Sequence, residues 1–194
     1  MDNQEALALF ARAGALLTGH FKLSSGLHSD QYVEKFRLFE DPRTLDLLAA
    51  DLAAGFADDR VDVVLGPTTA GIILAYAVAL HLGVEARYAE REGDERRLRR
   101  GQVLAPGARV LVVDDILTTG GSIRECLGVL QRHGAVLAGV GVLADRTGGE
   151  LTFGAPTRSA LCVKVAAFDP SACPQCAAGS PITAPGTRHL ASAS

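Results

Sequence analysis

Two adjacent acids precede a glycine-rich turn in segment 110–124, which reads VLVVDDILTTGGSIR. Asp114 and Asp115 follow an apolar run, and residues 118–122 lead into a helical pattern. Backbone N–H groups at a helix start, glycines that permit close approach and hydroxyl side chains together form a cradle for phosphate. The two acids can accept hydrogen bonds from ribose hydroxyls and hold hydrated magnesium. The segment therefore predicts a site for a phosphorylated ribose with its magnesium.

The alternative interpretation of this segment is an ordinary capped turn, because acids often follow strands and threonine often caps helices. The coincidence of two acids, two threonines and two glycines at one strand-to-helix junction favours the phosphate site. Other phosphate-binding motifs fit worse, since neither GxxxxGK[ST] nor GxGxxG occurs in the chain. A phosphoacceptor receiver domain would carry its acid pair near the N-terminus.

The elements that must position these residues form an alternating pattern. Continuous β-branched runs alternate with helical periodicity, which predicts an α/β fold with a parallel sheet covered on both faces. The predicted strands are 61–66, 84–90, 109–113 and 136–144, and the predicted helices between them are 71–82 and 119–133. Ligands bind at the carboxyl ends of such strands. The segments at those ends are 66–71, 90–101, 114–122 and 145–149.

The N-terminal part reads differently from this core. Residues 4–17 have helical spacing with Asp2 or Asn3 as the cap, and 20–35 reads as two short strands around the turn-rich SSGLHSD. A second helix is expected over 44–56, after Pro42. We therefore expect an N-terminal helix and hood over 1–40, an α/β core over 41–168 and an irregular tail over 169–194.

Composition restricts the function classes. The chain has 194 residues, 48% of them hydrophobic, and a net charge of -3, which gives no global case for a nucleic-acid partner. No apolar run approaches the roughly 20 residues needed to span a bilayer, and the N-terminus lacks the basic start of a signal peptide. We expect a cytoplasmic protein with no membrane partner.

Four cysteines, at 126, 162, 173 and 176, are too few and too late in the chain for a disulfide framework. Cys173 and Cys176 form CPQC, which is half of a zinc site. Structural zinc needs four ligands, so Cys162, His189 or Cys126 would have to converge on the pair. A packed or free cysteine pair is the interpretation that we favour.

The segment VLVVDDILTTGGS resembles the phosphoribosyl pyrophosphate (PRPP) signature of type I phosphoribosyltransferases. Further segments resemble the orotate phosphoribosyltransferase family, namely GHFKLSSGLHSDQYVEK, LGPTTAGIILAYAVA, YAEREGDERRLRRGQ and LADRTGG. The likeness covers residues 19–149. It implies the type I phosphoribosyltransferase fold with a small hood, and a homodimer with a shared active site. The implied reaction transfers ribose 5-phosphate from PRPP to orotate, with Mg²⁺, and gives orotidine 5′-monophosphate and pyrophosphate in pyrimidine (UMP) synthesis.

The resemblance also implies roles for individual residues. The PRPP-binding positions are Thr68, Thr69, Ala70, Gly71, Asp114, Asp115, Ile116, Leu117, Thr118, Thr119, Gly120, Gly121 and Ser122. The orotate-binding positions are Ser25, Gly26, Tyr32, Thr118 and Arg146, whose planar guanidinium suits a carboxylate. Asp114 and Asp115 would hold Mg²⁺ largely through water and PRPP. Segment 90–101 resembles a mobile catalytic loop, in which Arg91, Arg96 and Arg97 would act on the pyrophosphate together with the acids.

Three positions depart from the family pattern. Relatives often carry Lys where Ser24 and Ala70 stand, and an aromatic residue where Val33 stands. Two rival functions stay open: a transferase for another base such as a purine, and a non-catalytic PRPP-binding regulator. A purine lacks the carboxylate that Arg146 would bind. A regulator would show an added DNA-binding domain or loss of an acid, and the sequence shows neither.

Overall fold

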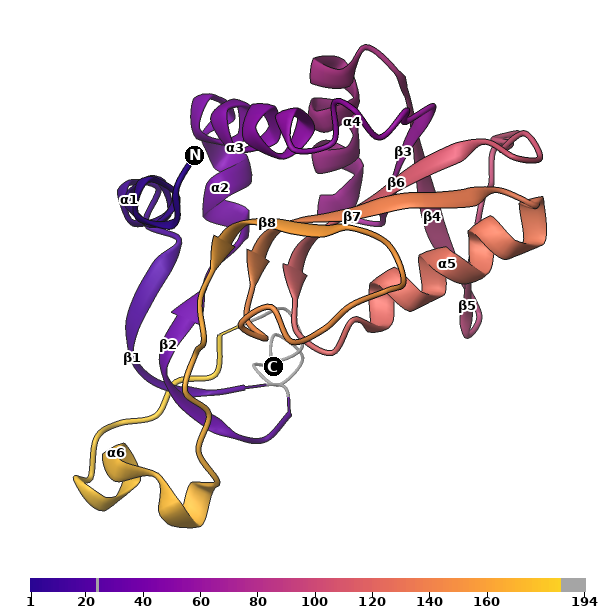
Figure 1. Cartoon of the computed structure of the whole chain (residues 1–194). Coiled ribbons are helices and arrows are strands. Elements are labelled where there is room, and N and C mark those ends of the chain that lie inside the picture. Colours follow the sequence, from indigo (N-terminus) through magenta and orange to yellow (C-terminus); the bar gives the residue numbers. More distant parts are fainter. Residues whose placement is uncertain (24, 186–194) are drawn as a thin grey trace.

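A six-stranded sheet runs through the computed structural model, which describes residues 1–23 and 25–185 (Figure 1). The strand order is β5-β4-β3-β6-β7-β8. The strands are β3 (Val63–Pro67), β4 (Glu85–Glu92), β5 (Glu95–Arg97), β6 (Arg109–Leu117), β7 (Val136–Asp145) and β8 (Thr157–Cys162). All neighbouring pairs are parallel except β4 and β5. The predicted α/β fold is thus confirmed, with an antiparallel edge strand that makes the sheet mixed.

Helices cover both faces of this sheet. On one face α3 (Pro42–Ala54) and α4 (Ala70–Leu82) pack over Leu111 and Val113, and on the other α5 (Gly121–His133) packs over Val110 and Val112. Successive side chains of a strand point to opposite faces, so a strand buried on both faces needs a continuous apolar run. This is why the sequence VLVV has no polar alternation.

The hood is the antiparallel hairpin of β1 (Leu16–Lys22) and β2 (His28–Val33). It lies between α1 (Asn3–Arg12), which Asp2 caps as predicted, and α2 (Phe36–Glu40). The expected helix over 4–17 is too long, because the chain turns at Gly14 with φ 68° and Leu16 already pairs with Val33. Tertiary pairing has overridden the helical pattern in its last turn.

The C-terminal tail returns to the hood. It contains a 3₁₀ turn, η1 (Pro170–Ala172), and a short helix, α6 (Pro174–Ala177), where we expected irregular chain. Phe168 exchanges two backbone hydrogen bonds of 2.8 Å with His28, and the Thr183 N–H donates to His20 O at 2.8 Å. Both edges of the hairpin are therefore paired with late segments of the chain. No described helix is long and apolar enough to cross a membrane.

Candidate active site

The acidic pair, Asp114 and Asp115, lies inside β6 and not after it. The strand continues past the predicted end at Val113 because Asp114 pairs with Val142 and Ile116 with Ala144 on β7. The two acids are 8% and 7% exposed. Of the other predicted PRPP residues on this strand, Leu117 is buried in the core, and its carbonyl oxygen accepts the Arg146 N–H at 3.0 Å.

The two carboxylates have different surroundings. Lys35 Nζ lies 2.7 Å from Asp115 Oδ2, so a cation compensates this charge. Burial, and secondly the charge of Asp115, raise the pKa of Asp114 to about 7. Asp114 Oδ1 accepts the Asp115 backbone N–H at 2.9 Å. Lys35 was missed by sequence reasoning, although it ends the quoted segment GHFKLSSGLHSDQYVEK.

The glycine-rich turn after β6 leads into α5 as predicted. Gly120 has φ 74°, and a Cβ there would lie 2.8 Å from Leu151 Cδ2, so both conformation and space require glycine. Among the described residues, no side chain caps the start of α5. Thr118, Thr119 and Gly121 are exposed around this helix start, and Ser122 is half-buried. The first N–H groups of α5, with these hydroxyls, are therefore available to an anion.

A second turn, residues 66–71, joins β3 to α4 and is called the pyrophosphate turn below. A Cβ on Gly66 would lie 2.0 Å from Gly71 O, so a residue with a side chain does not fit at this position. Thr68 N–H donates to Ala89 O at 3.0 Å, which fixes the turn beside β4. Thr69 precedes α4, and Ala70 is buried as its first residue. β3 and β6 are parallel neighbours in the sheet, so this turn and the acidic pair both lie at the carboxyl ends of the strands.

Segment 90–101, expected to be a mobile loop, contains the β4–β5 hairpin. Arg96 is 7% exposed and donates to Glu125 Oε2 at 2.8 Å and to Thr68 Oγ1 at 3.1 Å. Arg91 also donates to Glu125, at 2.6 Å, while Arg97 is exposed and pairs with acids of its own hairpin. Glu125, on α5, had no role in the sequence analysis. The three arginines are thus not equivalent, because only Arg96 is buried and hydrogen-bonded to Thr68 of the pyrophosphate turn.

Arg146 follows β7 and meets the hood. Burial lowers the pKa of Arg146, and its Nε has no hydrogen-bond partner within the described chain. Burial raises the pKa of Tyr32, and the charges of Lys35 and Arg146 oppose that rise, which puts Tyr32 near both cations. In Figure 1 the arrowheads of β6, β7 and β8 point toward the hood. A half-buried guanidinium with an unused, inaccessible N–H is a receptor for an anion.

The remaining hood positions differ in where they lie and in how exposed they are. Ser25 and Gly26 lie at the tip of the hairpin, where Ser25 is exposed and Gly26 has φ 87°. Val33 is 4% exposed and packs in the core, so it does not occupy the place of a ligand-stacking aromatic residue. Ser24 and His189 lie outside the described residues.

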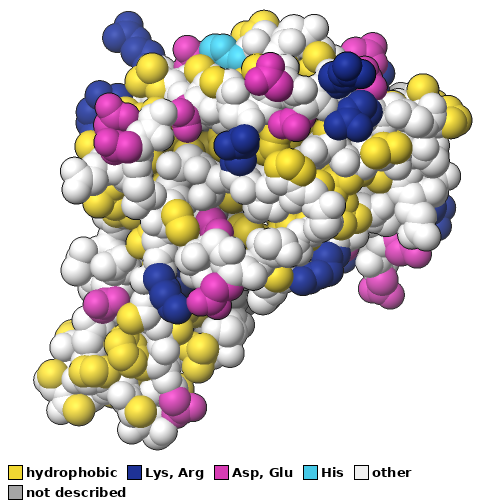
Figure 2. Space-filling view, in the orientation of Figure 1, with side chains coloured by type: hydrophobic (Ala, Val, Ile, Leu, Met, Phe, Trp, Pro, Cys, Tyr) yellow, Lys and Arg dark blue, Asp and Glu magenta, His cyan; other side chains and the backbone are white. Residues whose placement is uncertain are grey.

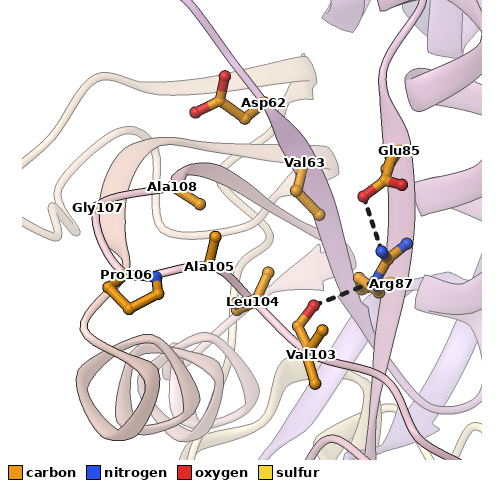
Figure 3. A pocket seen from close by; sticks show the side chains of 10 residues that line it. All are labelled: Asp62, Val63, Glu85, Arg87, Val103, Leu104, Ala105, Pro106, Gly107 and Ala108. Atoms are coloured by element: carbon orange, nitrogen blue, oxygen red, sulfur yellow. Dashed lines mark hydrogen bonds and ion pairs between the residues drawn. The ribbon is translucent and has the colours of Figure 1, made fainter.

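An open hollow of about 530 Å³ lies at the other end of the sheet. Figure 3 labels the side chains that line it. It lies beside Val63 and Glu85, which begin β3 and β4, and Arg87 bridges Glu85 and the Val103 carbonyl there. Ligands of parallel sheets bind at the carboxyl ends of the strands. We therefore assign this hollow no part in the chemistry.

Comparisons with known proteins identify the family of the chain. Residues 42–159 match the family described as phosphoribosyl transferase domain. The chain is 44% identical over 190 residues to the orotate phosphoribosyltransferase of Pelotomaculum thermopropionicum, covering 98% of this chain and 100% of the relative. For the enzyme of that name from Thermotoga maritima the identity is 43%, over 94% and 97%. The crystal structure of orotate phosphoribosyltransferase from Aeropyrum pernix superposes with a TM-score of 0.68 at 32% identity, over 82% and 93%.

Proposed function

The chain belongs to the orotate phosphoribosyltransferase family, and from this premise we propose that the carboxyl ends of β3, β6 and β7 form its active site. The enzyme transfers ribose 5-phosphate from PRPP to orotate in pyrimidine synthesis. A bond forms between the orotate ring nitrogen and C1′ of the ribose, and the C1′–O bond to pyrophosphate breaks. Pyrophosphate leaves with the electron pair. Catalysis is therefore chiefly the stabilisation of separating charge.

The acidic pair suits Mg²⁺ and the ribose. Both residues offer carboxylate oxygens, the ligands that Mg²⁺ prefers. In the described chain Asp114 has no ion-pair partner, whereas Asp115 has Lys35. When bound with PRPP, Mg²⁺ supplies positive charge near the pyrophosphate. Asp114 would hold the hydrated ion, and both acids would accept hydrogen bonds from the ribose hydroxyls.

Two backbone cradles hold the phosphates. Residues 118–122 and the first N–H groups of α5 bind the 5′-phosphate, because no side chain of residues 1–23 and 25–185 caps that helix. The pyrophosphate turn presents Thr68, Thr69, Ala70 and Gly71 to the leaving group. Arg96 holds Thr68 in place through its 3.1 Å hydrogen bond and so acts as a positioning residue.

Arg146 is the residue that supports orotate as the base that binds at this site. Its unpartnered Nε and its half-buried place near Tyr32 support a bidentate pair with the orotate carboxylate. Such a pair strengthens in a site that excludes water. Orotate reacts as an anion at its ring nitrogen, so the site needs no dedicated general base.

A panel of bases tests this function. The protein is incubated with PRPP, Mg²⁺ and either orotate, uracil or adenine, and loss of the base is followed by absorbance and chromatography. Uracil matches orotate except for the carboxylate that Arg146 binds. We expect turnover of orotate and at most a few per cent of that rate with uracil or adenine. Faster turnover of adenine would establish a purine transferase, and PRPP binding without any turnover would establish a regulator.

An apolar face of α4 supports the homodimer. Ile73, Tyr76 and Leu80 are 45%, 66% and 65% exposed, and their spacing places them along one side of the helix. Figure 2 shows hydrophobic side chains among charged groups on the upper part of the molecule, where α3 and α4 lie. Such a contiguous apolar strip is typical of a protein interface. A second copy of the chain is the partner that we propose, with a two-fold axis across α4.

The exposed arginines of the β4–β5 hairpin would then reach the neighbouring site. Side chains of Arg91 and Arg97 are each 53% exposed, unlike that of Arg96. The test mixes two inactive variants, Arg91→Ala/Arg97→Ala and Asp114→Asn/Asp115→Asn, after reversible dissociation. If the arginines act across the interface, heterodimers regain up to half of the normal activity. Verified heterodimers without activity would limit each hairpin to its own subunit or remove it from catalysis.

A further inference from the structure

The hood and the C-terminal tail bring four metal-ligating side chains to one point. His20 on β1 and His28 on β2 meet Cys173, directly before α6, and Cys176 within α6. One ligand atom from each lies within 4.8 Å of all the others. We propose that these four residues form a structural zinc site that fastens the tail to the hood. This inference does not depend on the proposed function.

The distances match the edges of a zinc tetrahedron. His20 Nε2 lies 3.1 Å from His28 Nδ1, 3.5 Å from Cys173 Sγ and 3.6 Å from Cys176 Sγ, and His28 Nδ1 lies 3.2 Å from Cys176 Sγ. Zinc bonds of about 2.0–2.1 Å to nitrogen and about 2.3 Å to sulfur give edges of roughly 3.3 Å between nitrogens and roughly 3.6 Å between nitrogen and sulfur. Each observed edge is within about 0.4 Å of these values. Cys₂His₂ is a donor set typical of structural zinc.

The hydrogen bonding of His20 also fits a metal ligand. Its Nδ1 lies 2.9 Å from Ser180 O, and a carbonyl oxygen only accepts, so Nδ1 carries the proton and Nε2 has the lone pair. That single lone pair has three polar neighbours within 3.6 Å, more than one hydrogen bond explains. A cation at the centre of the group accounts for all three. Metal-binding histidines commonly donate their other N–H to a backbone carbonyl in this way.

The cluster is built from the register of the hairpin. His28 pairs with Lys22 across the hood, and His20 lies on the facing strand where the pairing register shifts between Thr18 and Phe21. The two imidazole rings meet there, with their centroids 5.0 Å apart. His20, His28 and Cys173 are only 5%, 7% and 3% exposed. Four protein ligands leave no open coordination position for a substrate. The site is therefore structural and not catalytic.

Of the partners that the sequence analysis named for CPQC, Cys126 and Cys162 are wrong, and His189 lies outside the described residues. Cys126 is buried in the core between α5 and the sheet, and Cys162 ends β8, where its N–H donates to Asn3 Oδ1. Cys173 instead meets His20 across 153 residues of sequence. No local spacing reveals a pair of histidines so far from a pair of cysteines. Only the fold shows that the two half-sites converge.

Metal analysis of the purified full-length protein tests the proposal. The variants are Cys173→Ser and Cys176→Ser, with Cys162→Ser as the matched control because Cys162 lies on β8 outside the cluster. After dialysis against excess Zn²⁺ and then metal-free buffer, we expect about one zinc per chain in the wild type and the control. Each ligand variant should retain less than a tenth of this. Wild-type protein without zinc, or equal loss in Cys162→Ser, would overturn the site.

A second measurement avoids dependence on variants that fail to fold. Zinc is stripped from the wild-type protein by a chelator and replaced by Co²⁺, and the visible spectrum is recorded. Tetrahedral coordination by two thiolates and two imidazoles predicts intense d–d bands and a sulfur-to-metal charge-transfer band. Returning Zn²⁺ should raise Tm above that of the stripped protein. An octahedral cobalt spectrum, an unchanged Tm, or a Cys173–Cys176 disulfide in freshly purified protein would each contradict the proposal.

Discussion

Replacing Asp114 by asparagine should stabilise the unliganded protein at and above neutral pH while weakening PRPP binding. Burial and the charge of Asp115 raise the pKa of Asp114 from 3.8 to about 7. The unfolded chain releases this proton near pH 4. Between about pH 4 and pH 7 the folded protein therefore binds more protons, and its stability falls as the pH rises. The loss is complete above pH 7, where the carboxylate is charged in both states.

The magnitude follows from the size of the pKa shift. A rise of about three units, at about 1.36 kcal/mol per unit, sets an upper bound of about 4 kcal/mol on the cost of ionising Asp114 in the folded protein. Asparagine removes this cost and keeps the oxygen that accepts the Asp115 N–H. Relaxation of the site reduces the gain, so we expect about 1–3 kcal/mol at pH 8. For a chain of this size that raises Tm by roughly 3–10 °C.

Thermal unfolding at pH 5 and pH 8, without Mg²⁺ or PRPP, measures the effect. The gain in Tm should be larger at pH 8 than at pH 5, and calorimetry should show weaker PRPP binding in the presence of Mg²⁺. The control is Asp115→Asn, which removes a charge that disfavours ionised Asp114 but also breaks the 2.7 Å ion pair with Lys35, so its gain should be smaller than that of Asp114→Asn. A Tm difference that is independent of pH, or equal stabilisation by Asp115→Asn, would refute the reasoning.

The Arg146→Ala variant should raise the Michaelis constant for orotate roughly ten- to hundred-fold, because a hydrogen bond to a charged group contributes about 1.5–3 kcal/mol; steady-state kinetics showing an equal rise for PRPP would contradict carboxylate recognition. Gly66→Ala should destabilise the fold by about 1–3 kcal/mol in denaturant unfolding, since its Cβ would lie 2.0 Å from Gly71 O. The matched Gly128→Ala, whose Cβ would meet only Arg132 Nη1 at 3.5 Å, should be neutral or stabilising. Leu80→Asp should convert the proposed dimer to monomer in sedimentation, and an unchanged mass would exclude α4 from the interface.

Local sequence patterns predicted the strands that are buried on both faces and the helices that end at a glycine. β3, β6 and β7 could be predicted without knowing which strands lie beside them, because a strand buried on both faces is a continuous apolar run. Gly83 and Gly134 ended their helices with φ 70° and 66°, as glycine at that position predicts. The glycine-rich turn at Gly120 was likewise readable from residue type alone.

The contacts that sequence could not supply are those between distant segments. The end of β6 depends on its pairing with β7, so the acidic pair was placed after the strand instead of within it. Lys35 and Glu125 are ordinary charged residues until the fold sets them against Asp115 and Arg96. The charged residues of 90–101 give no sign in the sequence that one of them is buried. The structure shows that Arg96 is buried and donates a hydrogen bond to Thr68.

The pairing of the hood with the tail has a consequence for synthesis. Thr183 and His20 are separated by 163 residues, yet the two segments are hydrogen-bonded neighbours. At about 5–20 residues per second, β1 is made roughly 8–30 s before the segment that covers its outer edge. During this interval the strand presents unpaired N–H and C=O groups to other nascent chains. The first hairpin to be translated is thus among the last to be completed, and a chain that terminates before residue 183 keeps that edge open.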